Sequence, residues 1–197
     1  MKNNKLQASV MITLLFVAAS AAAGVDVGDT APAFTLSDTE GNLVKLADYR
    51  GKVVVLEWLN PDCPFVKRHY DEDTMKKLTS AYDDSGVVWL TINSTNYMDG
   101  AANASFAKKE DVDWPILVDQ DGTVGHAYGA ATTPHMFIIN KEGKVVYDGA
   151  VDDDPRGNKA AAERTNYVAN ALDEVLAGKA VTTPETKPYG CSVKYKN

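Results

Sequence analysis

Two cysteines carry the most reactive side chains of this 197-residue chain, and they lie far apart in it. Cys63 stands within Asn-Pro-Asp-Cys-Pro-Phe-Val, where an apolar run gives way to a charged stretch. Cys191 lies in a C-terminal segment that contains Pro184, Pro188 and Gly190. A cysteine at either place can be a nucleophile that exchanges electrons, a partner in a structural disulfide, or a small core residue.

The residues around Cys63 favour the nucleophile. A strand-like apolar run precedes it, and a helix-like stretch begins directly after it, so Pro64 would occupy the first helical position, where its missing N–H costs nothing. Free N–H groups and the dipole of a helix start stabilise a thiolate, and Lys67 adds a positive charge on the same helical face. We expect a lowered pKa for the Cys63 thiol. An inert, buried thiol is the alternative.

Composition and charge limit the class of protein to which this chain can belong. An apolar fraction of 45% and a charged fraction of 24% are those of an ordinary globular chain. The formal net charge of −7 argues against a nucleic-acid partner or an anionic membrane surface, since both need a basic patch. The length is that of one domain plus a processing segment.

The N-terminus has the features of a secretory signal peptide. Lys2 and Lys5 precede an apolar stretch at 6–19, and small residues follow at 18–24. The stretch is shorter than the roughly 20 residues that span a bilayer, so an uncleaved anchor helix is the weaker alternative. We therefore predict a signal peptide at 1–23, export to an oxidising compartment, the periplasm in a bacterium, and no stable membrane insertion after cleavage.

Several elements must position the cysteines. Two short strands are expected around a turn at 40–42, and apolar runs at 53–59, 87–92 and 115–118 read as buried strands. Residues 136–140 and 144–148 predict an antiparallel hairpin. Helices are expected over 65–82, 101–109 and 159–177, the last with a buried stripe of Ala162, Val168, Ala169, Leu172, Val175 and Leu176. This alternation predicts an α/β fold with a central mixed sheet and helices on both faces.

Three separated motifs resemble one family. Gly28-Asp-Thr-Ala-Pro-Ala-Phe-Thr-Leu and Gly51-Lys-Val-Val-Val-Leu are similar to the opening of the redoxin branch of the thioredoxin-fold superfamily, which includes alkyl hydroperoxide reductases and thiol-specific antioxidants. The segment from Trp58 to Val66, Thr133-Pro134-His135 and Gly190-Cys-Ser-Val-Lys-Tyr resemble exported, peroxiredoxin-like bacterial members. The resemblance implies a thioredoxin-like domain at 26–180, an N-terminal β-hairpin extension, and a C-terminal tail at 181–197.

The resemblance also implies a place for Thr133-Pro134. In that family the Thr-Pro peptide bond before the hairpin is cis, faces the active cysteine and presents backbone groups to an extended substrate. Carried to this chain, Thr133 and Pro134 would face Cys63. His135 follows Pro134, so of the three histidines it should lie nearest the cysteine. Together with Asn60, Pro64 and Lys67 they form the expected substrate-binding set. An ordinary trans proline before a strand is the alternative.

This chain departs from the family at several positions. A thioredoxin-type Cys-x-x-Cys would place the second thiol at position 66, where this chain has Val66. A typical peroxiredoxin has Pro-x-x-x-Thr-x-x-Cys with a peroxide-binding threonine, whereas this chain has Leu56 at the proline position and Asn60 at the threonine position. The peroxide-polarising arginine has no clear match, and Arg156 and Arg164 are candidates by default. The sequence therefore does not separate peroxide from disulfide substrates.

Cys191 offers a partner for Cys63. Secreted proteins with two cysteines usually pair them, so we hypothesise that Cys191 approaches Cys63, forms a Cys63–Cys191 disulfide and acts as the resolving thiol. A purely structural bond that ties down the tail is the alternative.

Glu57 is an unusual residue for a buried strand, because a buried carboxylate is costly unless it has a role. It lies six residues before Cys63, the offset at which thioredoxin carries its buried acid, which relays protons to and from the cysteine pair. We hypothesise the same role here, with a pKa raised by desolvation. An ion pair with a lysine is the alternative.

Three histidines and an acidic run allow a metal interpretation. His69 is expected on a helix surface, and a soft-metal site of Cys63, Cys191 and His135 is the weaker alternative to redox chemistry. The run Asp152 to Asp154 reads most simply as a solvated loop.

We therefore interpret the chain as an exported thiol-based oxidoreductase, with Cys63, Cys191 and Glu57 as its catalytic residues. It would act on a protein disulfide, a thiol or a hydroperoxide and be regenerated by an external thiol reductant. This chemistry requires no organic cofactor and no metal. A non-catalytic binding module or a copper carrier with the same fold is the alternative function.

Overall fold

The computed structural model describes residues 24–196. The signal peptide predicted at 1–23 lies outside these residues. Within the described part of the chain, no helix is long and apolar enough to cross a membrane.

The order of elements follows the expected alternation of strands and helices. The strands are β1 (Thr35–Asp38), β2 (Leu43–Lys45), β3 (Val54–Trp58), β4 (Val88–Asn93), β5 (Ile116–Val118), β6 (Thr132–Thr133), β7 (His135–Ile139), β8 (Val145–Gly149) and β9 (Cys191–Ser192). The α-helices are α1 (Pro64–Asp71), α2 (Thr74–Tyr82), α3 (Gly100–Glu110), α4 (Thr123–Tyr128) and α5 (Tyr167–Leu176).

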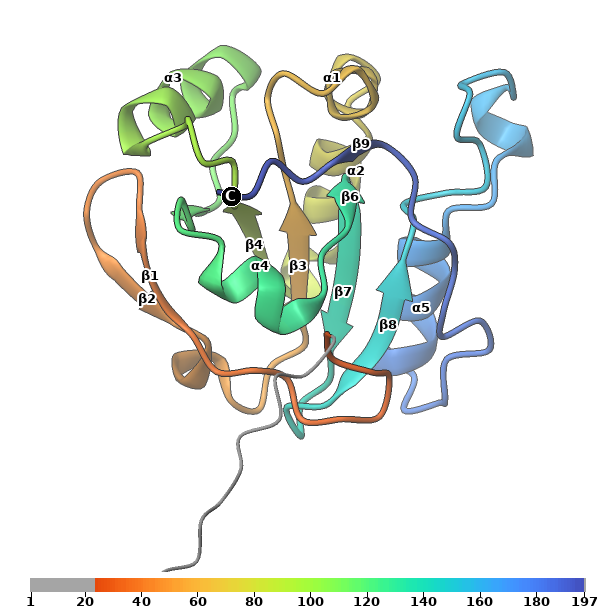
Figure 1. Cartoon of the computed structure of the whole chain (residues 1–197). Helices are drawn as coiled ribbons and strands as arrows, with labels where there is room; N and C mark the ends of the chain where they lie inside the picture. The colour runs from red at the N-terminus through yellow and green to blue at the C-terminus, as the bar shows by residue number, and fades with distance from the viewer. Residues whose placement is uncertain (1–23, 197) are drawn as a thin grey trace, which may run out of the picture.

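The central sheet is mixed, as predicted. Its seven strands run in the order β2-β1-β5-β4-β3-β7-β8, and β3, β4 and β5 are parallel neighbours (Figure 1). β7 is antiparallel to β3 and pairs His135 with Trp58. The start of β7 therefore lies beside the carboxyl end of β3, which brings the loop before β7 to the loop that carries Cys63.

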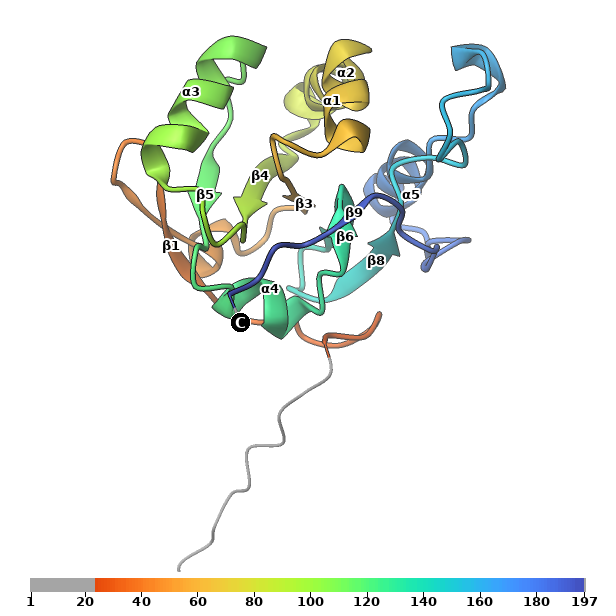
Figure 2. The same cartoon turned by 45° about the horizontal axis from the view of Figure 1, so that its top comes forward.

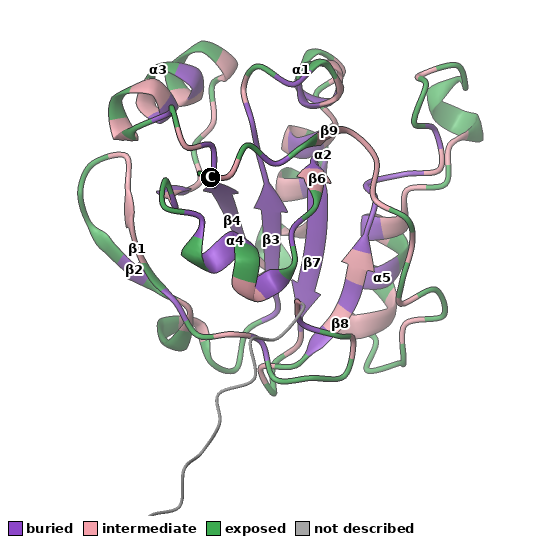
Figure 3. Ribbon diagram, in the orientation of Figure 1, coloured by how far each residue is buried: buried purple, intermediate pink, exposed green. Residues whose placement is uncertain are grey.

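The central strands are buried on both faces. All five residues of β3 are buried, and β3 and β7 stand out as the buried centre of the sheet in Figure 3. Alternate side chains of β3 enter different clusters, because successive residues of a strand point to opposite faces. Val55 joins one cluster, whereas Leu56 and Trp58 join the other.

Helices cover both faces. α1, α2 and α5 contribute Val66, Met75 and Leu172 to the cluster that contains Val55. α4 lies on the opposite face, in front of the sheet in Figure 1, and contributes Tyr128 to the other cluster. The architecture is the α/β fold with a central mixed sheet that the sequence predicts.

Two predicted helices are shorter than expected. The helix predicted over 65–82 is broken into α1 and α2 at Asp73, whose φ of 54° lies in the left-handed region. The helix predicted from Lys159 begins only at Tyr167, after Asn166 accepts a hydrogen bond from the Ala169 N–H and so caps α5. Of the predicted stripe, Val168 and Leu172 are buried and Ala162 is exposed, whereas the others are half-buried: Ala169, Val175 and Leu176.

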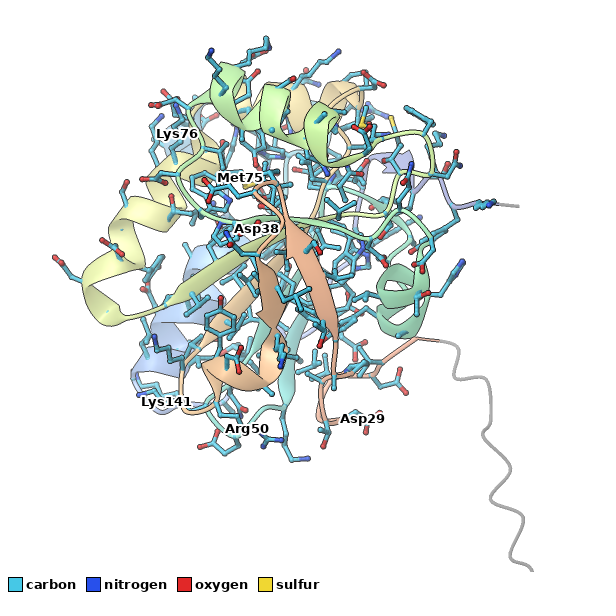
Figure 4. The ribbon with its side chains drawn as sticks, turned by 90° about the vertical axis from the view of Figure 1, so that its left-hand side faces the viewer. Asp29, Asp38, Arg50, Met75, Lys76 and Lys141 are labelled. Carbon is cyan, nitrogen blue, oxygen red and sulfur yellow. The ribbon has the colours of Figure 1, made fainter. Side chains whose placement is uncertain are left out.

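The predicted N-terminal hairpin extends the main sheet. β1 pairs with β2 and also with β5, so the hairpin forms one edge of the seven-stranded sheet. Asp38, labelled in Figure 4, closes the turn by accepting hydrogen bonds from the N–H groups of Glu40 at 2.8 Å and Asn42 at 2.9 Å.

Candidate active site

Cys63 stands at the helix start, where the sequence places it. It is the N-cap residue of α1 with extended backbone angles (φ −73°, ψ 123°), and Pro64 opens the helix. The Cys63 N–H donates to the Asn60 carbonyl at 3.0 Å, which makes the loop after β3 a tight turn. The Cys63 side chain is only 1% exposed, so something other than solvent covers the thiol.

The Thr133–Pro134 loop covers the thiol from one side. The Thr133–Pro134 peptide bond is cis, as the resemblance implies. The Cys63 Sγ donates a hydrogen bond to the Thr133 carbonyl at 2.9 Å. The hydroxyl of Thr133 is buried and has no other hydrogen-bond partner among the described residues, so a thiolate at Cys63 is the acceptor that satisfies it.

The C-terminal tail brings Cys191 to the same place. β9 pairs antiparallel with β6, with Cys191 opposite Thr133, and the Val193 N–H donates to the Ala131 carbonyl at 3.1 Å. In Figures 1 and 2 the dark blue tail crosses the sheet at the start of β7, close to α1. Both cysteines are free thiols in this structure.

The two thiols have pKa shifts of opposite sign. Burial raises the pKa of the Cys63 thiol, but hydrogen bonds to its sulfur outweigh burial and lower the net pKa from its ordinary value. The donors are the Val66 N–H, the thiol and N–H of Cys191, and the Thr133 side chain. Burial, the hydrogen bond to Cys63 and the charge of its thiolate raise the pKa of Cys191 to about 11.

Asn60 shapes the cysteine loop, and Lys67 contacts Cys63 through its backbone. The Asn60 side chain is buried, and its Oδ1 accepts a hydrogen bond from the Asp62 N–H at 2.8 Å. The Lys67 N–H donates to the Cys63 carbonyl at 3.0 Å, whereas its side chain is exposed and is not among the main groups that shift the pKa of Cys63. The thiolate is stabilised by hydrogen-bond donors at the helix start and from the tail.

Glu57 is fully buried on the face of the sheet that α1 covers. Its carboxyl accepts hydrogen bonds from Tyr70 Oη (3.2 Å), Trp89 Nε1 (3.0 Å) and Thr91 Oγ1 (3.0 Å). The alternative of a lysine ion pair is therefore wrong, because all three partners are neutral. Burial raises the pKa of Glu57 to about 7, although these three donors oppose the shift.

Both ring nitrogens of His135 are bonded away from the thiols. Its Nδ1 accepts from the Ala131 N–H at 3.2 Å, and its Nε2 pairs with Asp148 Oδ1 at 2.5 Å. Its ring packs against Phe137 on the sheet face opposite to the cluster that contains Cys63. The groups that bond the Cys63 sulfur come from Thr133, Cys191 and Val66, and not from His135.

The structure does not support the predicted soft-metal site of Cys63, Cys191 and His135. Because both ring nitrogens of His135 are engaged elsewhere, this residue does not join the two thiols. Among residues 24–196, no three His, Cys, Asp or Glu side chains are grouped so that they could share an ion.

Two sequence interpretations near α1 are also wrong. His69 is fully buried, not on the helix surface. Asp152 and Asp154 are each 3% exposed, so the acidic run is not a solvated loop. Asp154 Oδ2 pairs with Arg164 Nε at 2.9 Å, which offsets the cost of burying the carboxylate.

Sequence reasoning missed two tyrosines beside the cysteines. Tyr97 is 56% exposed, and its hydroxyl donates to Asp62 Oδ2 at 3.3 Å, so an exposed aromatic ring is fastened to the cysteine loop. Tyr189 lies in the tail, and its hydroxyl contacts three charged or polar side chains around α1. A signal existed for the tail, because Tyr189, Cys191, Val193 and Tyr195 alternate with more polar or small residues, the pattern of a strand.

The chain is similar to known proteins over most of its length. A family model described as Redoxin matches residues 26–166. A relative from Geobacillus thermodenitrificans, thiol-disulfide oxidoreductase ResA, is 37% identical over 121 residues, which cover 61% of this chain and 67% of the relative. Cys191 lies beyond the residues that the family model matches.

Solved structures share the fold. A hypothetical protein from Sinorhizobium meliloti superposes with a TM-score of 0.79 at 29% identity and covers 88% of this chain and 96% of its own. An uncharacterized conserved protein from Geobacillus kaustophilus gives a TM-score of 0.78 at 31% identity, with 87% of this chain and 93% of its own covered. The fold, the cysteine at the start of α1, the cis-proline loop beside it and the family match over 26–166 lead to one assignment: the chain belongs to the Redoxin family.

Proposed function

We propose that this protein is a thiol–disulfide oxidoreductase in which Cys63 is the nucleophile and Cys191 is the resolving thiol. One observation carries the proposal: Cys191 lies opposite Thr133, whose carbonyl accepts the hydrogen bond of the Cys63 thiol, so the two cysteines meet at one backbone group. The pKa of Cys63 is lowered and that of Cys191 is raised. The thiolate is the reactive form, so Cys63 attacks first while Cys191 keeps its proton. The similarity to a relative named thiol-disulfide oxidoreductase supports this class of reaction.

The reaction has two exchange steps. The Cys63 thiolate attacks one sulfur of a substrate disulfide, which breaks the substrate S–S bond and releases one substrate thiolate. Cys191 then gives up its proton to that leaving group and attacks Cys63 Sγ. This attack breaks the bond between Cys63 and the substrate, releases the second substrate sulfur as a thiolate that takes up a proton from solvent, and leaves a Cys63–Cys191 disulfide. Two electrons pass to the substrate. An external thiol reductant returns them to the protein, and the net reaction can also run in reverse.

A disulfide substrate fits the site better than a hydroperoxide. Asn60 replaces the hydroxyl that would engage the peroxide, and its side chain is committed to the cysteine turn. Of the two arginines that are candidates to polarise a peroxide, Arg164 is bound to Glu72 and Asp154, and Arg156 is exposed. In the proposed mechanism, the backbone of Thr133 and Pro134, together with Asn60 and Pro64, surrounds the incoming sulfur.

Glu57 is the proposed proton relay. Its carboxyl has a pKa of about 7, so it exchanges a proton near neutral pH, which a general acid or base must do. Its hydrogen-bond partner Tyr70 lies on α1, the helix that Cys63 caps. If Glu57→Gln leaves the pH dependence of Cys63 alkylation unchanged, the relay role is wrong.

Export to the periplasm completes the proposal. The signal-peptide pattern at the N-terminus supports it, and disulfide chemistry suits an oxidising compartment. There, protein thiols and disulfides would be the substrates, and a periplasmic dithiol the reductant.

The test is a thiol count and a rate. The reduced protein is mixed with oxidised glutathione, and its free thiols are counted under denaturing, non-reducing conditions. We expect both thiols to be lost together in the wild type, a stable Cys63–glutathione adduct in Cys191→Ser, and no fast reaction in Cys63→Ser. Fast reaction with hydrogen peroxide and none with the disulfide would show a peroxidase instead, and no reaction with either would overturn the proposal.

A further inference from the structure

Tyr189 fastens the tail to the helix that carries Cys63. Its hydroxyl is hydrogen-bonded by Arg68 Nη2 at 3.1 Å and by His69 Nε2 at 3.0 Å, and it donates to Asp152 Oδ1. Arg68 and His69 belong to α1, and Asp152 follows β8. One phenol group therefore joins three segments of the chain.

The ring of Tyr189 adds contacts to the same helix. Its centroid lies 6.0 Å from that of Phe65 and 6.1 Å from that of His69, and the Arg68 Cζ stands 5.8 Å from it. All three partners lie on α1, whose N-cap is Cys63. The residue that anchors the tail and the residue that attacks the substrate are thus held by one rigid helix.

The polar groups around Tyr189 are themselves fixed. His69 is fully buried, Arg68 Nη1 donates to the Asp154 carbonyl at 2.6 Å, and Asp152 is 3% exposed. Burying this many polar groups is costly unless each finds a partner, and the Tyr189 hydroxyl is a partner that three of them share. None of these groups takes part in the two exchange steps.

Little freedom remains between Tyr189 and Cys191. The single residue between them, Gly190, has a φ of 143° and lies so close to the Thr133 carbonyl that a Cβ would stand 2.0 Å from its oxygen. Anchoring Tyr189 therefore fixes the direction in which the chain reaches β9, and with it the place of the Cys191 thiol.

We propose that Tyr189 is a positioning residue for the second exchange step, and that its hydroxyl, through Arg68, His69 and Asp152, holds Cys191 against Cys63. This inference rests on the proposed function, because it concerns the step in which Cys191 resolves the mixed disulfide. When the tail is held in place, the Cys191 thiol has a high effective concentration beside Cys63 Sγ. When the tail is loose, it must first dock before Cys191 can react.

The test separates the two steps. Tyr189→Phe keeps the ring and removes the hydroxyl. Tyr82→Phe is the matched control, because the Tyr82 hydroxyl also bonds a carboxylate, Asp173 Oδ1 at 2.8 Å, and its hydrogen-bond partners lie on α5 and not in the tail. Each reduced protein is mixed with oxidised glutathione and quenched with acid. Mass spectrometry then follows the Cys63–glutathione mixed disulfide and the Cys63–Cys191 disulfide over time.

We expect Tyr189→Phe to accumulate the mixed disulfide because its resolution slows about tenfold, the effect of losing one hydrogen bond to a charged group. Formation of the mixed disulfide should stay within about twofold of the wild type, and Tyr82→Phe should match the wild type in both steps. Arg68→Leu leaves the tail sequence intact and should slow the same step.

The outcomes are distinguishable. If the wild type forms neither species, the proposed function fails. If the wild type forms the intrachain disulfide and both Tyr189→Phe and Arg68→Leu resolve the mixed disulfide at its rate, the positioning role alone is overturned. The free energy of unfolding of every variant is measured as well. A merely structural role would lower it equally in Tyr82→Phe and Tyr189→Phe, and would leave the ratio of mixed disulfide to Cys63–Cys191 disulfide unchanged.

Discussion

Cys191 lies directly opposite Thr133 in a two-stranded antiparallel ladder, although the two residues come from the tail and from the loop before β7. The same Thr133 carbonyl accepts a hydrogen bond from the Cys63 thiol. The tail therefore occupies the strand edge at which an extended substrate would add, and it covers the nucleophile. Reactivity at Cys63 should depend on what the tail donates and on how firmly it is docked.

The first prediction concerns the thiol of Cys191 as a hydrogen-bond donor. Cys191→Ser keeps a donor group beside Cys63, whereas Cys191→Ala removes it. Because donors to the thiolate lower the pKa of Cys63, the rate of iodoacetamide alkylation should reach its plateau at a higher pH in Cys191→Ala than in Cys191→Ser. At neutral pH the difference should be about fivefold to tenfold. Identical pH profiles in the two variants would contradict the role of this donor.

The second prediction concerns Gly190. In Gly190→Ala the new Cβ would meet the Thr133 carbonyl oxygen at 2.0 Å, the Thr133 carbonyl carbon at 2.7 Å and the Pro134 nitrogen at 3.3 Å. All three atoms are backbone, so the tail has to move away. Alkylation of Cys63 should become at least about tenfold faster as the thiol is uncovered, and the yield of the intrachain disulfide should fall.

Gly178→Ala is the control for Gly190→Ala. Gly178 also has a positive φ, 70°, but an added Cβ meets nothing within 4 Å. It should cost about 1–2 kcal/mol of backbone strain and leave the reactivity of Cys63 unchanged. Equal alkylation rates in both variants would show that the tail does not cover the thiol.

The third prediction concerns the pH dependence of stability. The pKa of Glu57 rises from 4.5 to about 7 on folding. Its contribution to the free energy of unfolding is therefore complete below pH 4.5 and is lost as the pH rises through 7. The loss amounts to at most about 3 kcal/mol. Glu57→Gln should therefore be more stable than the wild type at pH 8, but no more stable at pH 4.5.

Denaturant unfolding at both pH values measures this difference. Glu142→Gln, a change of an exposed carboxyl in the turn between β7 and β8, is the control and should leave the pH dependence as in the wild type. A stability gain in Glu57→Gln that is equal at both pH values would argue against a raised pKa.

The fourth prediction concerns His135, which pairs with Asp148 and not with the thiols. His135→Ala should destabilise the fold by about 2 kcal/mol. The Asp148 carboxylate loses its buried histidine partner, and the Ala131 N–H is left without its acceptor. The alkylation profile of Cys63 should not change. A shift of that profile, or the loss of bound copper(I) in this variant alone, would restore a place for His135 at the site.

The sequence contained enough to predict the sheet and the cysteine turn. The apolar runs of β3 and β4 are long enough to indicate buried strands, and Pro64 after Cys63 marks a helix start by its fixed geometry. The cis bond at Thr133–Pro134 followed from the family resemblance and is confirmed.

The features that the sequence does not predict have two physical origins. Asp73 takes a left-handed conformation and breaks the helix between α1 and α2, although residues 65–82 contain no glycine or proline. His69 and Asp152 are buried and both bond Tyr189, which lies more than a hundred residues after His69. Patterns within one segment cannot reveal such distant partners, so they favour a helix-surface residue and a solvated loop.

The path of the tail also has a topological consequence. The chain leaves Cys63 at the start of α1, builds α1 to α5 and the strands between them, and returns to Cys63 only at β9. Joining the two thiols would enclose residues 63–191, about three quarters of the described residues, in a covalent loop that leaves β1, β2 and β3 outside it. Closing a ring of about 100 residues removes roughly 4.7 kcal/mol of chain entropy from the unfolded state. Each catalytic turnover would thus open and close this loop. The oxidised form, with the loop closed, would be the more resistant to unfolding.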